Sequence, residues 1–315
     1  MKVLVTGGAG FIGSHLVERL LATGHGVTVL DDLSTGKLEN LPHAGDVELV
    51  TGDVADLGAV ATAAKGVDAV VHLAAVASVA ASVLDPLGTS RTNLTGSLTV
   101  FQAAAAAGVK RLVYASSASV YGDPETVPLS EDAPKRPLSP YAVDKLAGEH
   151  YLAHFHRTGR LDTAAFRFFN VYGPRQDPSS PYSGVISIFM ERSIRRQPLT
   201  IFGDGQQTRD FVYVADVVDV LARAVEESTE TATGSPEALT PMNLGRGEAV
   251  SLLELIDTIG SVVGGAAPAV TFEPARSGDI RHSLADVSAL ALRYGRPATT
   301  LSDGLTATLA ATLVG

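Results

Sequence analysis

The segment Lys2–Gly13, KVLVTGGAGFIG, decides the fold that the sequence predicts. Lys2–Thr6 is a short apolar run typical of a buried strand, and Phe11 begins a stretch with helical periodicity. The turn Gly7–Gly13 between them fits both G-x-G-x-x-G and G-x-x-G-x-x-G. Glycines here permit a tight turn and bring backbone N–H groups close to a pyrophosphate, which the helix N-terminus attracts. A strand, a glycine turn and a helix in this order predict a dinucleotide-binding βαβ unit.

Alternating strand and helix patterns extend from this segment over the first half of the chain. The apolar runs are rich in Val and Leu, as strands covered on both faces of a parallel sheet should be. We predict an α/β fold: a Rossmann-type doubly wound parallel sheet with a smaller C-terminal α+β substrate domain. The further predicted strands are Gly26–Asp31, Val47–Thr51, Ala69–Leu73, Arg111–Ser116 and Ala164–Phe169, and the predicted helices are Phe11–Thr23, Leu87–Ala107 and Tyr141–Arg157.

The pattern becomes irregular after Asn170, where Gly and Pro residues indicate a long loop. We predict two interleaved domains, the first formed by residues 1–170 and about 211–245, the second by 171–210 and 246–315. The Thr/Ser/Glu-rich segment Glu226–Pro241 is typical of a solvated loop. The elements predicted for the second domain are helices Val185–Arg196, Ser251–Val263 and Asp286–Tyr294, and strands Leu199–Gly203 and Val270–Phe272.

The composition limits the ligands that the chain can bind. Its 315 residues carry 24 Lys and Arg against 34 Asp and Glu, a formal net charge of −10. This balance argues against general binding of nucleic acid or membrane surfaces. There is no cysteine, which excludes disulfides, thiolate nucleophiles and sulfur-ligated metals. The apolar stretch Val70–Leu84 is shorter than the ~20 residues of a membrane-spanning helix, and the start lacks signal-peptide features, so we expect a cytoplasmic protein.

An acidic residue after the second predicted strand indicates which dinucleotide binds. Asp31 lies 18 residues after Gly13, near the ~20-residue offset of the carboxylate that binds the adenosine ribose hydroxyls. A carboxylate there repels a 2′-phosphate, which favours NAD over NADP. Asp32 is a second candidate for the cofactor, or alternatively a solvated loop acid.

The candidate chemical centre combines a helix with a strand end. Tyr141 and Lys145 are spaced i and i+4, on one face of a predicted helix. A neighbouring ammonium, with the positive ring of oxidised NAD, would lower the pKa of the phenol and make it a base. Ser117 directly follows a predicted strand, where doubly wound sheets bind ligands, and its hydroxyl could contact the reacting oxygen beside Tyr141.

With these motifs the chain resembles the extended short-chain dehydrogenase/reductase family, and within it the UDP-glucose 4-epimerases. The resemblance runs over essentially the whole length. It rests on the glycine turn, the Ser117, Tyr141 and Lys145 centre, and a set of shorter motifs: Gly52-Asp53, His72-Leu73-Ala74-Ala75, Asn93, Arg167-Phe168-Phe169-Asn170, Thr208-Arg209-Asp210-Phe211 and Arg276-Ser277-Gly278-Asp279.

The resemblance implies roles for residues in both predicted domains, the first binding NAD and the second a nucleotide sugar. Tyr141 would be the catalytic base, Lys145 would hold the nicotinamide ribose, and Ser117 would bridge to the substrate. The cofactor would contact Gly7, Gly10, Phe11, Ile12, Gly13, Asp31, Asp32, Asp53, Val54, Leu73, Ala74, Ala75, Asn93, Ser116, Tyr141 and Lys145. The UDP-sugar would contact Ser117, Ser119, Tyr141, Asn170, Gly184, Val185, Arg209, Arg276, Asp279 and Ser283.

The residues after Ser117 favour one reaction. Family members that eliminate water carry an Asp-Glu pair there, and decarboxylating relatives carry a Glu, whereas this chain has Ala118 and Ser119. Oxidation at C4 needs only Tyr, Lys and cofactor, so we predict NAD-dependent 4-epimerisation of a UDP-hexose through a 4-keto intermediate. The alternatives are 4-ketoreduction or dehydrogenation, epimerisation of a UDP-uronic acid, and a non-catalytic NAD-binding regulator.

Further expectations concern metal, assembly and sugar size. His154 and His156 are two residues apart on a predicted helix and face different directions, so no metal site is predicted. The resemblance implies a homodimer that pairs through Leu87–Ala107 and Tyr141–Arg157. It also places Ser283 where some relatives carry a bulky Tyr at the sugar pocket, so the small serine predicts that N-acetylated sugars are accepted as well.

Overall fold

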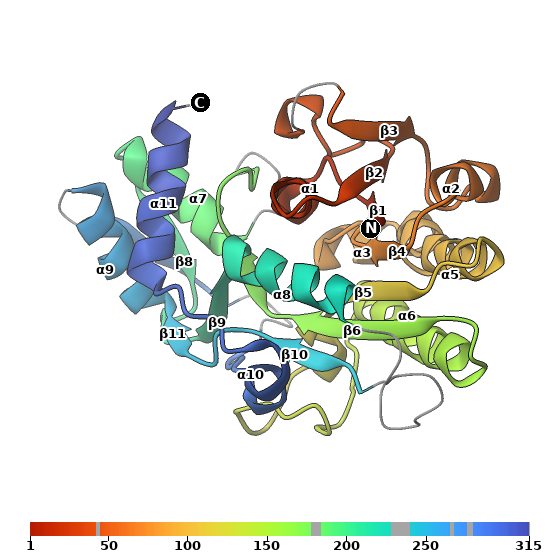
Figure 1. The fold of residues 1–315 in the computed structure, drawn as a ribbon. Coiled ribbons are helices and arrows are strands. Elements are labelled where there is room, and N and C mark those ends of the chain that lie inside the picture. The colour runs from red at the N-terminus through yellow and green to blue at the C-terminus, as the bar shows by residue number, and fades with distance from the viewer. Residues whose placement is uncertain (42–44, 178–183, 228–239, 265–267, 276–279, 315) are drawn as a thin grey trace. The chain divides into compact units, whose positions relative to one another are not determined.

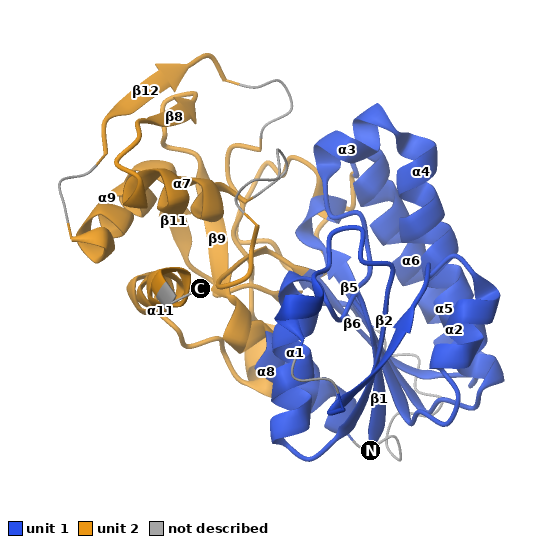
Figure 2. Ribbon diagram, turned by 90° about the horizontal axis from the view of Figure 1, so that it is seen from above, with its two compact units in different colours: residues 1–120, 137–167, 218–242 blue, residues 121–136, 168–217, 243–315 orange. Residues whose placement is uncertain are grey.

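The computed structural model describes residues 1–41, 45–177, 184–227, 240–264, 268–275 and 280–314. The chain divides into two compact units (Figure 2), each assembled from three stretches of sequence. Unit 1 comprises Met1–Val120, Pro137–Arg167 and Val218–Met242; unit 2 comprises Tyr121–Arg136, Phe168–Val217 and Asn243–Gly315. The division proposed from the sequence differs mainly in the segments 121–136 and 211–217, which it kept with the first domain, and by a few residues at 168–170 and 243–245.

The strands of unit 1 belong to a seven-stranded sheet in the order β10-β6-β5-β4-β1-β2-β3, in which the edge strand β10 has only its first residue in unit 1 (Figure 1). β1 pairs in parallel with β2 and β4, β2 with β3, and β4 with β5. The register sets Thr6 level with Leu30 and His72, and His72 level with Tyr114, so the carboxyl ends of these strands meet at one edge. The strands are β1 (Lys2–Thr6), β2 (Gly26–Asp31), β3 (Val47–Thr51), β4 (Ala69–His72), β5 (Arg111–Ser117), β6 (Asp162–Phe168) and β10 (Met242–Leu244).

Helices cover both faces of this sheet, which makes the fold doubly wound as predicted. α1 and α8 lie on one side, joined by a 2.6 Å ion pair between Arg19 and Asp219, and α2, α5 and α6 lie on the other (Figure 2). Side chains such as Leu4, Phe101 and Tyr114 form a fully buried core. The helices are α1 (Phe11–Ala22), α2 (Leu57–Ala63), α3 (Val79–Leu84), α4 (Pro86–Ser90), α5 (Gly96–Ala106), α6 (Pro140–Arg157) and α8 (Val214–Glu226).

The helix predicted over Leu87–Ala107 is present, but it is not α-helical throughout. The chain forms α4, a π-helical turn at Arg91–Thr95, and α5. Asn93 lies in the π-helical turn, where its amide accepts a hydrogen bond from the Val76 N–H at 2.8 Å and donates to the Val76 carbonyl at 3.2 Å. Apolar periodicity does not distinguish this wider turn from an α-helical one, which is why the sequence did not predict it.

Unit 2 contains two small sheets, ordered β11-β9-β7 and β12-β8. Asn243 joins its separate stretches, because it accepts a hydrogen bond from the Tyr121 hydroxyl at 2.6 Å and donates one to the Leu129 carbonyl at 2.7 Å. The buried core of unit 2 includes Phe189, Phe211 and Leu255. The elements are β7 (Asn170–Tyr172), α7 (Val185–Ile194), β8 (Leu199–Phe202), β9 (Thr208–Tyr213), β11 (Ala249–Ser251), α9 (Leu252–Val263), β12 (Val270–Glu273), α10 (Ser288–Tyr294) and α11 (Leu301–Val314).

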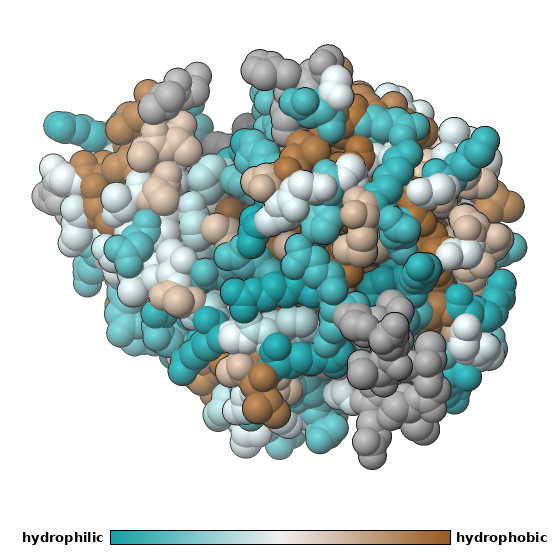
Figure 3. All heavy atoms as spheres, in the orientation of Figure 1, coloured by the Kyte–Doolittle hydropathy of each residue, from teal (hydrophilic) through white to brown (hydrophobic). Residues whose placement is uncertain are grey.

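The sequence predicted the regular elements better than the short ones. β1, β2 and β3 have the predicted bounds, whereas α2, α3, α8 and α11 were not predicted at all. Most of the predicted loop Glu226–Pro241 lies outside the described residues. Among the helices of the described ranges, none combines the length and apolarity needed to cross a membrane. The face seen in Figure 3 carries hydrophilic side chains interspersed with smaller apolar groups.

Candidate active site

The glycine turn after β1 forms one side of the site in unit 1. Gly7 has a φ of +70° and donates its N–H to the Leu30 carbonyl at 2.8 Å. A Cβ at Gly7 would lie 2.8 Å from the backbone nitrogen of Ala74, and a Cβ at Gly13 would lie 2.1 Å from the Gly7 carbonyl oxygen. The absence of a side chain at Gly13 therefore lets α1 pack closely against the turn.

The two aspartates after β2 have different surroundings. Asp31 is buried, and its carboxylate accepts hydrogen bonds from the Ala9 and Leu33 N–H groups, both at 2.9 Å. Asp31 thus connects the end of β2 to the glycine turn, where a ribose-binding carboxylate is expected. Asp32 is exposed and accepts hydrogen bonds from the N–H and hydroxyl of Ser34, which is the solvated-loop alternative.

Residues predicted to contact the adenine side lie next to these strands. Asp53 accepts a hydrogen bond from the Ala55 N–H at 2.7 Å and pairs with Arg91. Burial alone would raise the pKa of Asp53. The hydrogen bond from Ala55 and the guanidinium of Arg91 outweigh this effect, so the pKa of the carboxyl lies below its ordinary value. Val54 is buried, and its side chain occupies the space above Gly96.

The backbone after β4 runs beside the glycine turn. Leu73 donates its N–H to the Thr6 carbonyl at 3.2 Å, and Ala74 donates to the Thr6 hydroxyl at 3.3 Å. Leu73, Ala74 and Ala75 are all partly exposed. Asn93 is buried, and its side-chain amide makes two hydrogen bonds with the backbone of Val76. Asn93 therefore holds this backbone segment in place.

These residues fit a dinucleotide such as NAD. The turn brings backbone close to Ala74 only because Gly7 has no side chain, and α1 begins directly behind it at Phe11 and Ile12, with Gly10 as the capping residue. A helix N-terminus with free N–H groups suits a pyrophosphate, and a buried carboxylate one strand away suits ribose hydroxyls. The cradle and the acid therefore occupy the positions that the cofactor requires.

Ser117 and Tyr141, the candidate reactive residues, interact in unit 1. α6 begins at Pro140 because the Ser139 side chain accepts a hydrogen bond from the Ala142 N–H, which places Tyr141 in the first turn. Burial raises the pKa of Tyr141 above its ordinary value, and the interaction with the Ser117 hydroxyl acts in the opposite direction. The phenol is thus a weaker acid than the sequence predicted, and the protein chain alone does not supply the lowering.

Lys145 lies one turn further along α6, fully enclosed. Its ammonium donates a hydrogen bond to the Ala115 carbonyl at 2.8 Å and lies 5.9 Å from the centre of the Tyr141 ring. Burial lowers the pKa of Lys145 to about 8, with the nearby Asp144 acting in the opposite direction. The structure therefore brings Ser117, Tyr141 and Lys145 together at the carboxyl end of β5.

Two buried networks around this centre escaped the sequence analysis. The Ser116 hydroxyl, predicted to face the cofactor, donates to Glu149 at 2.5 Å, and Glu149 forms an ion pair with Arg167 at 2.8 Å. His72 bonds the hydroxyls of Thr6 and Ser97 at 2.7 and 3.0 Å. Burial lowers the pKa of His72 to about 3, with Lys145 adding to the effect, so the imidazole is neutral. No local spacing signals the first network, because Glu149 pairs with Ser116 and Arg167 on other elements.

In unit 2 the predicted substrate residues lie on and beside the β7–β9 pair. Asn170 is exposed and lies level with Phe211, and Arg209 lies on β9. The backbone of Ser283 is held against β9, donating its N–H to the Thr208 carbonyl at 3.2 Å. The structure thus places Ser283 beside β9, the strand that carries Arg209. Arg276 and Asp279 lie outside the described residues.

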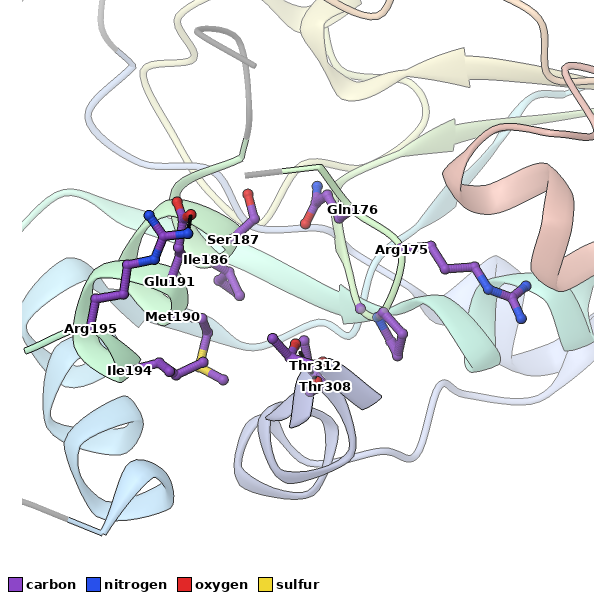
Figure 4. A pocket seen from close by; sticks show the side chains of 12 residues that line it. Arg175, Gln176, Ile186, Ser187, Met190, Glu191, Ile194, Arg195, Thr308 and Thr312 are labelled. Carbon is purple, nitrogen blue, oxygen red and sulfur yellow. Dashed lines mark hydrogen bonds and ion pairs between the residues drawn. The ribbon is translucent and has the colours of Figure 1, made fainter. Parts of the chain in front are cut away.

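Other predicted substrate residues are placed separately. Gly184 caps the start of α7 and Val185 is its first residue. Ser119, in unit 1, has a buried hydroxyl without a partner among the described atoms. A hollow of about 300 Å³ in unit 2 lies between α7 and α11 (Figure 4), where Met190, Thr308 and Thr312 line it. None of the predicted site residues lines this hollow.

The described residues contain no group of three or more His, Asp or Glu side chains that could hold a metal ion. On α6, His156 is buried whereas His154 is exposed, as expected for positions two residues apart.

Comparison with known proteins shows the family to which the chain belongs. The model of the NAD dependent epimerase/dehydratase family matches residues 3–239. A UDP-glucose 4-epimerase from Mycolicibacterium smegmatis is 42% identical, over 98% of this chain and 97% of the relative. A UDP-N-acetylglucosamine 4-epimerase from Methanobrevibacter ruminantium has a TM-score of 0.92 at 35% identity, over 99% of this chain and 98% of that one. A Thermus thermophilus UDP-glucose 4-epimerase in complex with NAD has a TM-score of 0.88 at 39% identity, over 99% of this chain and 98% of that one.

Proposed function

We propose that this chain, which belongs to the NAD dependent epimerase/dehydratase family, interconverts UDP-hexoses that differ in configuration at C4. The predicted family, the Rossmann-type fold and NAD as cofactor are confirmed. The expectation of a nucleotide-sugar 4-epimerase is likewise confirmed by the relatives. The identity of the hexose is our proposal: glucose and galactose, together with their N-acetylated forms.

The observation that carries the proposal is the grouping of Ser117, Tyr141 and Lys145 at the end of β5, beside the glycine cradle of unit 1. Reversible oxidation of a secondary alcohol needs a proton acceptor, a hydrogen-bond partner for the oxygen, and a cation near the acceptor. The three side chains supply these functions. The next two residues, Ala118 and Ser119, offer no carboxyl group for elimination or decarboxylation.

We infer the following roles in the reaction. When bound, oxidised NAD would accept the hydride from C4, return it to the opposite face of the 4-keto sugar, and supply a positive charge near the phenol. Tyr141 takes the proton from the C4 hydroxyl and later returns it to the oxygen of the 4-keto sugar. Ser117 donates a hydrogen bond to the same oxygen. Because burial alone raises the pKa of Tyr141, we expect this phenol to act as a base only when the cofactor is oxidised and bound.

Two features support N-acetylated sugars as substrates. Position 283 carries a small side chain, and the backbone of Ser283 is fixed to β9 next to Arg209. The Methanobrevibacter relative, similar over both units, is named for UDP-N-acetylglucosamine. We assign nucleotide recognition to residues of unit 2 and C4 chemistry to unit 1.

A panel of UDP-sugars tests the function directly. Purified protein with NAD⁺ is incubated with UDP-glucose, UDP-galactose, their N-acetylated forms and UDP-glucuronic acid, and the C4 configuration is followed by proton NMR. We expect interconversion of both hexose pairs without net NADH. Stoichiometric NADH formation would instead favour a dehydrogenase, and conversion of the uronic acid alone would favour a uronic acid epimerase.

We also propose that the protein is a homodimer. α3 and α4 pack against α6 and expose large apolar side chains, among them Val83, Leu84 and Leu87, the last being 84% exposed. Such side chains on adjoining helices suit a two-fold interface with a second copy. Leu87→Glu should reduce the mass measured by sedimentation equilibrium to that of a monomer. Leu292→Glu, on α10 and 92% exposed, is the matched control and should leave the mass unchanged.

A further inference from the structure

Tyr114 is a buried aromatic residue of β5 that the proposed reaction does not use. Its ring stacks on His72 at 5.9 Å between centroids with a 21° interplanar angle, and meets Phe101 edge-on at 5.5 Å. The Lys145 ammonium lies 5.2 Å from the centre of the Tyr114 ring, closer than its 5.9 Å from the Tyr141 ring. The ammonium is therefore next to two aromatic rings, and the nearer one is Tyr114.

Apart from these two aromatic rings, few groups offset the positive charge of Lys145. Asp144, beside it on α6, accepts a hydrogen bond from Ser90 at 2.7 Å, and Glu149 is paired with Arg167. Within the part of the chain that the structure describes, no carboxylate lies within ion-pair distance of Lys145. The Ala115 carbonyl is its one hydrogen-bond acceptor there. A buried ammonium in such surroundings depends on whatever polarisable groups lie nearby.

Gly148 allows the close approach of α6 to Tyr114. A Cβ at Gly148 would lie 2.3 Å from the Tyr114 hydroxyl oxygen and 2.8 Å from Cζ. Gly148 lies one helical turn after Lys145, on the same side of α6. The absence of a side chain at Gly148 therefore lets α6 pack closely against Tyr114. This packing brings the Lys145 ammonium near the face of the Tyr114 ring.

We propose that Tyr114 is a positioning residue, whose ring face stabilises the Lys145 ammonium through a cation–π interaction and holds it beside Tyr141. The idea rests on the proposed function only in assigning a catalytic use to Lys145. Tyr114 remains a neutral ring in this role, because burial holds the pKa of its hydroxyl above the ordinary value. The groups that face Lys145 are Tyr114 on β5, the neutral His72 on β4, and Tyr141 and Asp144 on α6, with the Glu149–Arg167 pair beyond them.

A fluorination series tests the cation–π interaction without changing the packing. Phenylalanine and its mono-, di- and trifluorinated analogues are placed at position 114, since fluorine withdraws electron density from the ring face. The chain has six lysines, all in the described ranges, and Lys145 is the buried one, so its ¹³Cε signal can be followed by NMR in the ligand-free protein. We expect the pKa of Lys145 to fall stepwise with fluorination, by roughly half a unit or more in total.

Phe155 provides the matched control. It is buried in the same cluster and packs on Phe101, but its ring is not among those near Lys145. The same analogues at position 155 should leave the Lys145 titration unchanged. An unchanged pKa across the series at position 114, or an equal response at position 155, would overturn the proposal.

A turnover measurement separates this inference from the proposed function. Tyr114→Phe keeps the ring and should retain kcat within about threefold of wild type, whereas Tyr114→Leu removes it and should lower kcat about tenfold or more with little change in KM. The alkaline limb of the kcat pH profile of Tyr114→Leu should also move to lower pH, because the Lys145 ammonium loses stabilisation. If wild type converts no UDP-sugar, the proposed function fails, while the NMR series still decides the role of Tyr114. If wild type is active and Tyr114→Leu equals it in kcat and pH profile, Tyr114 has no such role.

Discussion

Units 1 and 2 hold their candidate site residues in different ways. In unit 1, Asp31, Ser117 and Lys145 follow or pack on parallel strands, and each makes hydrogen bonds that limit its position. In unit 2, Asn170, Arg209 and Ser283 lie on or beside short strands and are partly or fully exposed. The comparison teaches that the proposed reactive groups are held by a regular sheet, whereas the proposed sugar-binding residues lie on short segments that can change without disturbing that sheet. Substitutions in unit 1 should therefore have the larger effects.

Replacing Tyr141 is the most severe test of this contrast. Tyr141→Phe removes the proton acceptor but keeps the ring in the first turn of α6, so kcat should fall about a thousandfold or more while NAD⁺ affinity changes little. Tyr151→Phe, an exposed position on the same helix, is the control and should behave as wild type. Turnover by NMR and NAD⁺ binding by calorimetry measure both quantities. Activity of Tyr141→Phe within tenfold of wild type would remove the chemistry from unit 1 as assigned.

Lys145 should cost stability while it serves the reaction. Burial lowers its pKa from 10.5 to about 8, so the folded state is penalised by about 3 kcal/mol wherever both states are protonated. The penalty is fully present below pH 8 and disappears as pH rises from 8 to 10.5, because the folded state releases its proton first. Lys145→Met should therefore abolish activity yet raise the free energy of unfolding at pH 7.

Urea unfolding at pH 7 and pH 9.5 measures this effect. The gain in stability from Lys145→Met should be largest at pH 7 and much smaller at pH 9.5. Lys65→Met, at an exposed position, should change stability at neither pH. A Lys145→Met variant that is less stable than wild type at pH 7 would mean that the ammonium is stabilising in the fold, contrary to the surroundings described for it.

Asp31 and its neighbour offer a paired test of cofactor choice. Asp31→Asn keeps an oxygen for one backbone N–H but removes the charge that repels a 2′-phosphate, so the preference for NAD⁺ over NADP⁺ should fall about tenfold or more. Asp32→Asn should leave the preference unchanged, because Asp32 faces solvent and bonds Ser34. Titration calorimetry with both dinucleotides measures the ratio. The reverse outcome would assign the ribose contact to Asp32.

The smallest expected effect lies in unit 2. Ser283→Tyr should lower kcat/KM for the N-acetylated sugars about tenfold and leave the unsubstituted hexoses within about threefold, since the added ring takes the volume needed by an acetamido group. Ser288→Tyr, exposed on α10, is the control for the added ring. Steady-state kinetics on both substrate pairs decide it. Equal losses on both pairs would mean that Ser283 supports the segment and does not select the sugar.

The same contrast explains what the sequence could predict. The glycine turn, Asp31 and the Tyr141–Lys145 spacing were readable because each lies at a fixed offset from a regular strand or helix. The Ser116–Glu149–Arg167 network joins β5, α6 and β6, so its partners become neighbours only after the sheet has formed. The π-helical turn at Asn93 and the use of its amide on Val76 have no signal in apolar periodicity. In unit 2 the short strands pair over long separations, which local patterns do not encode.

The hydrogen bond between Tyr121 and Asn243 has a consequence for synthesis of the chain. It joins residues 122 positions apart, and Leu129 pairs in turn with Leu284. The stretch 121–136 can make these bonds only after more than a hundred further residues have been synthesised. Neither unit can be completed from an amino-terminal fragment, because each also draws on stretches near or beyond residue 240. We therefore expect that neither an amino-terminal nor a carboxyl-terminal half of the chain folds by itself into one of these units.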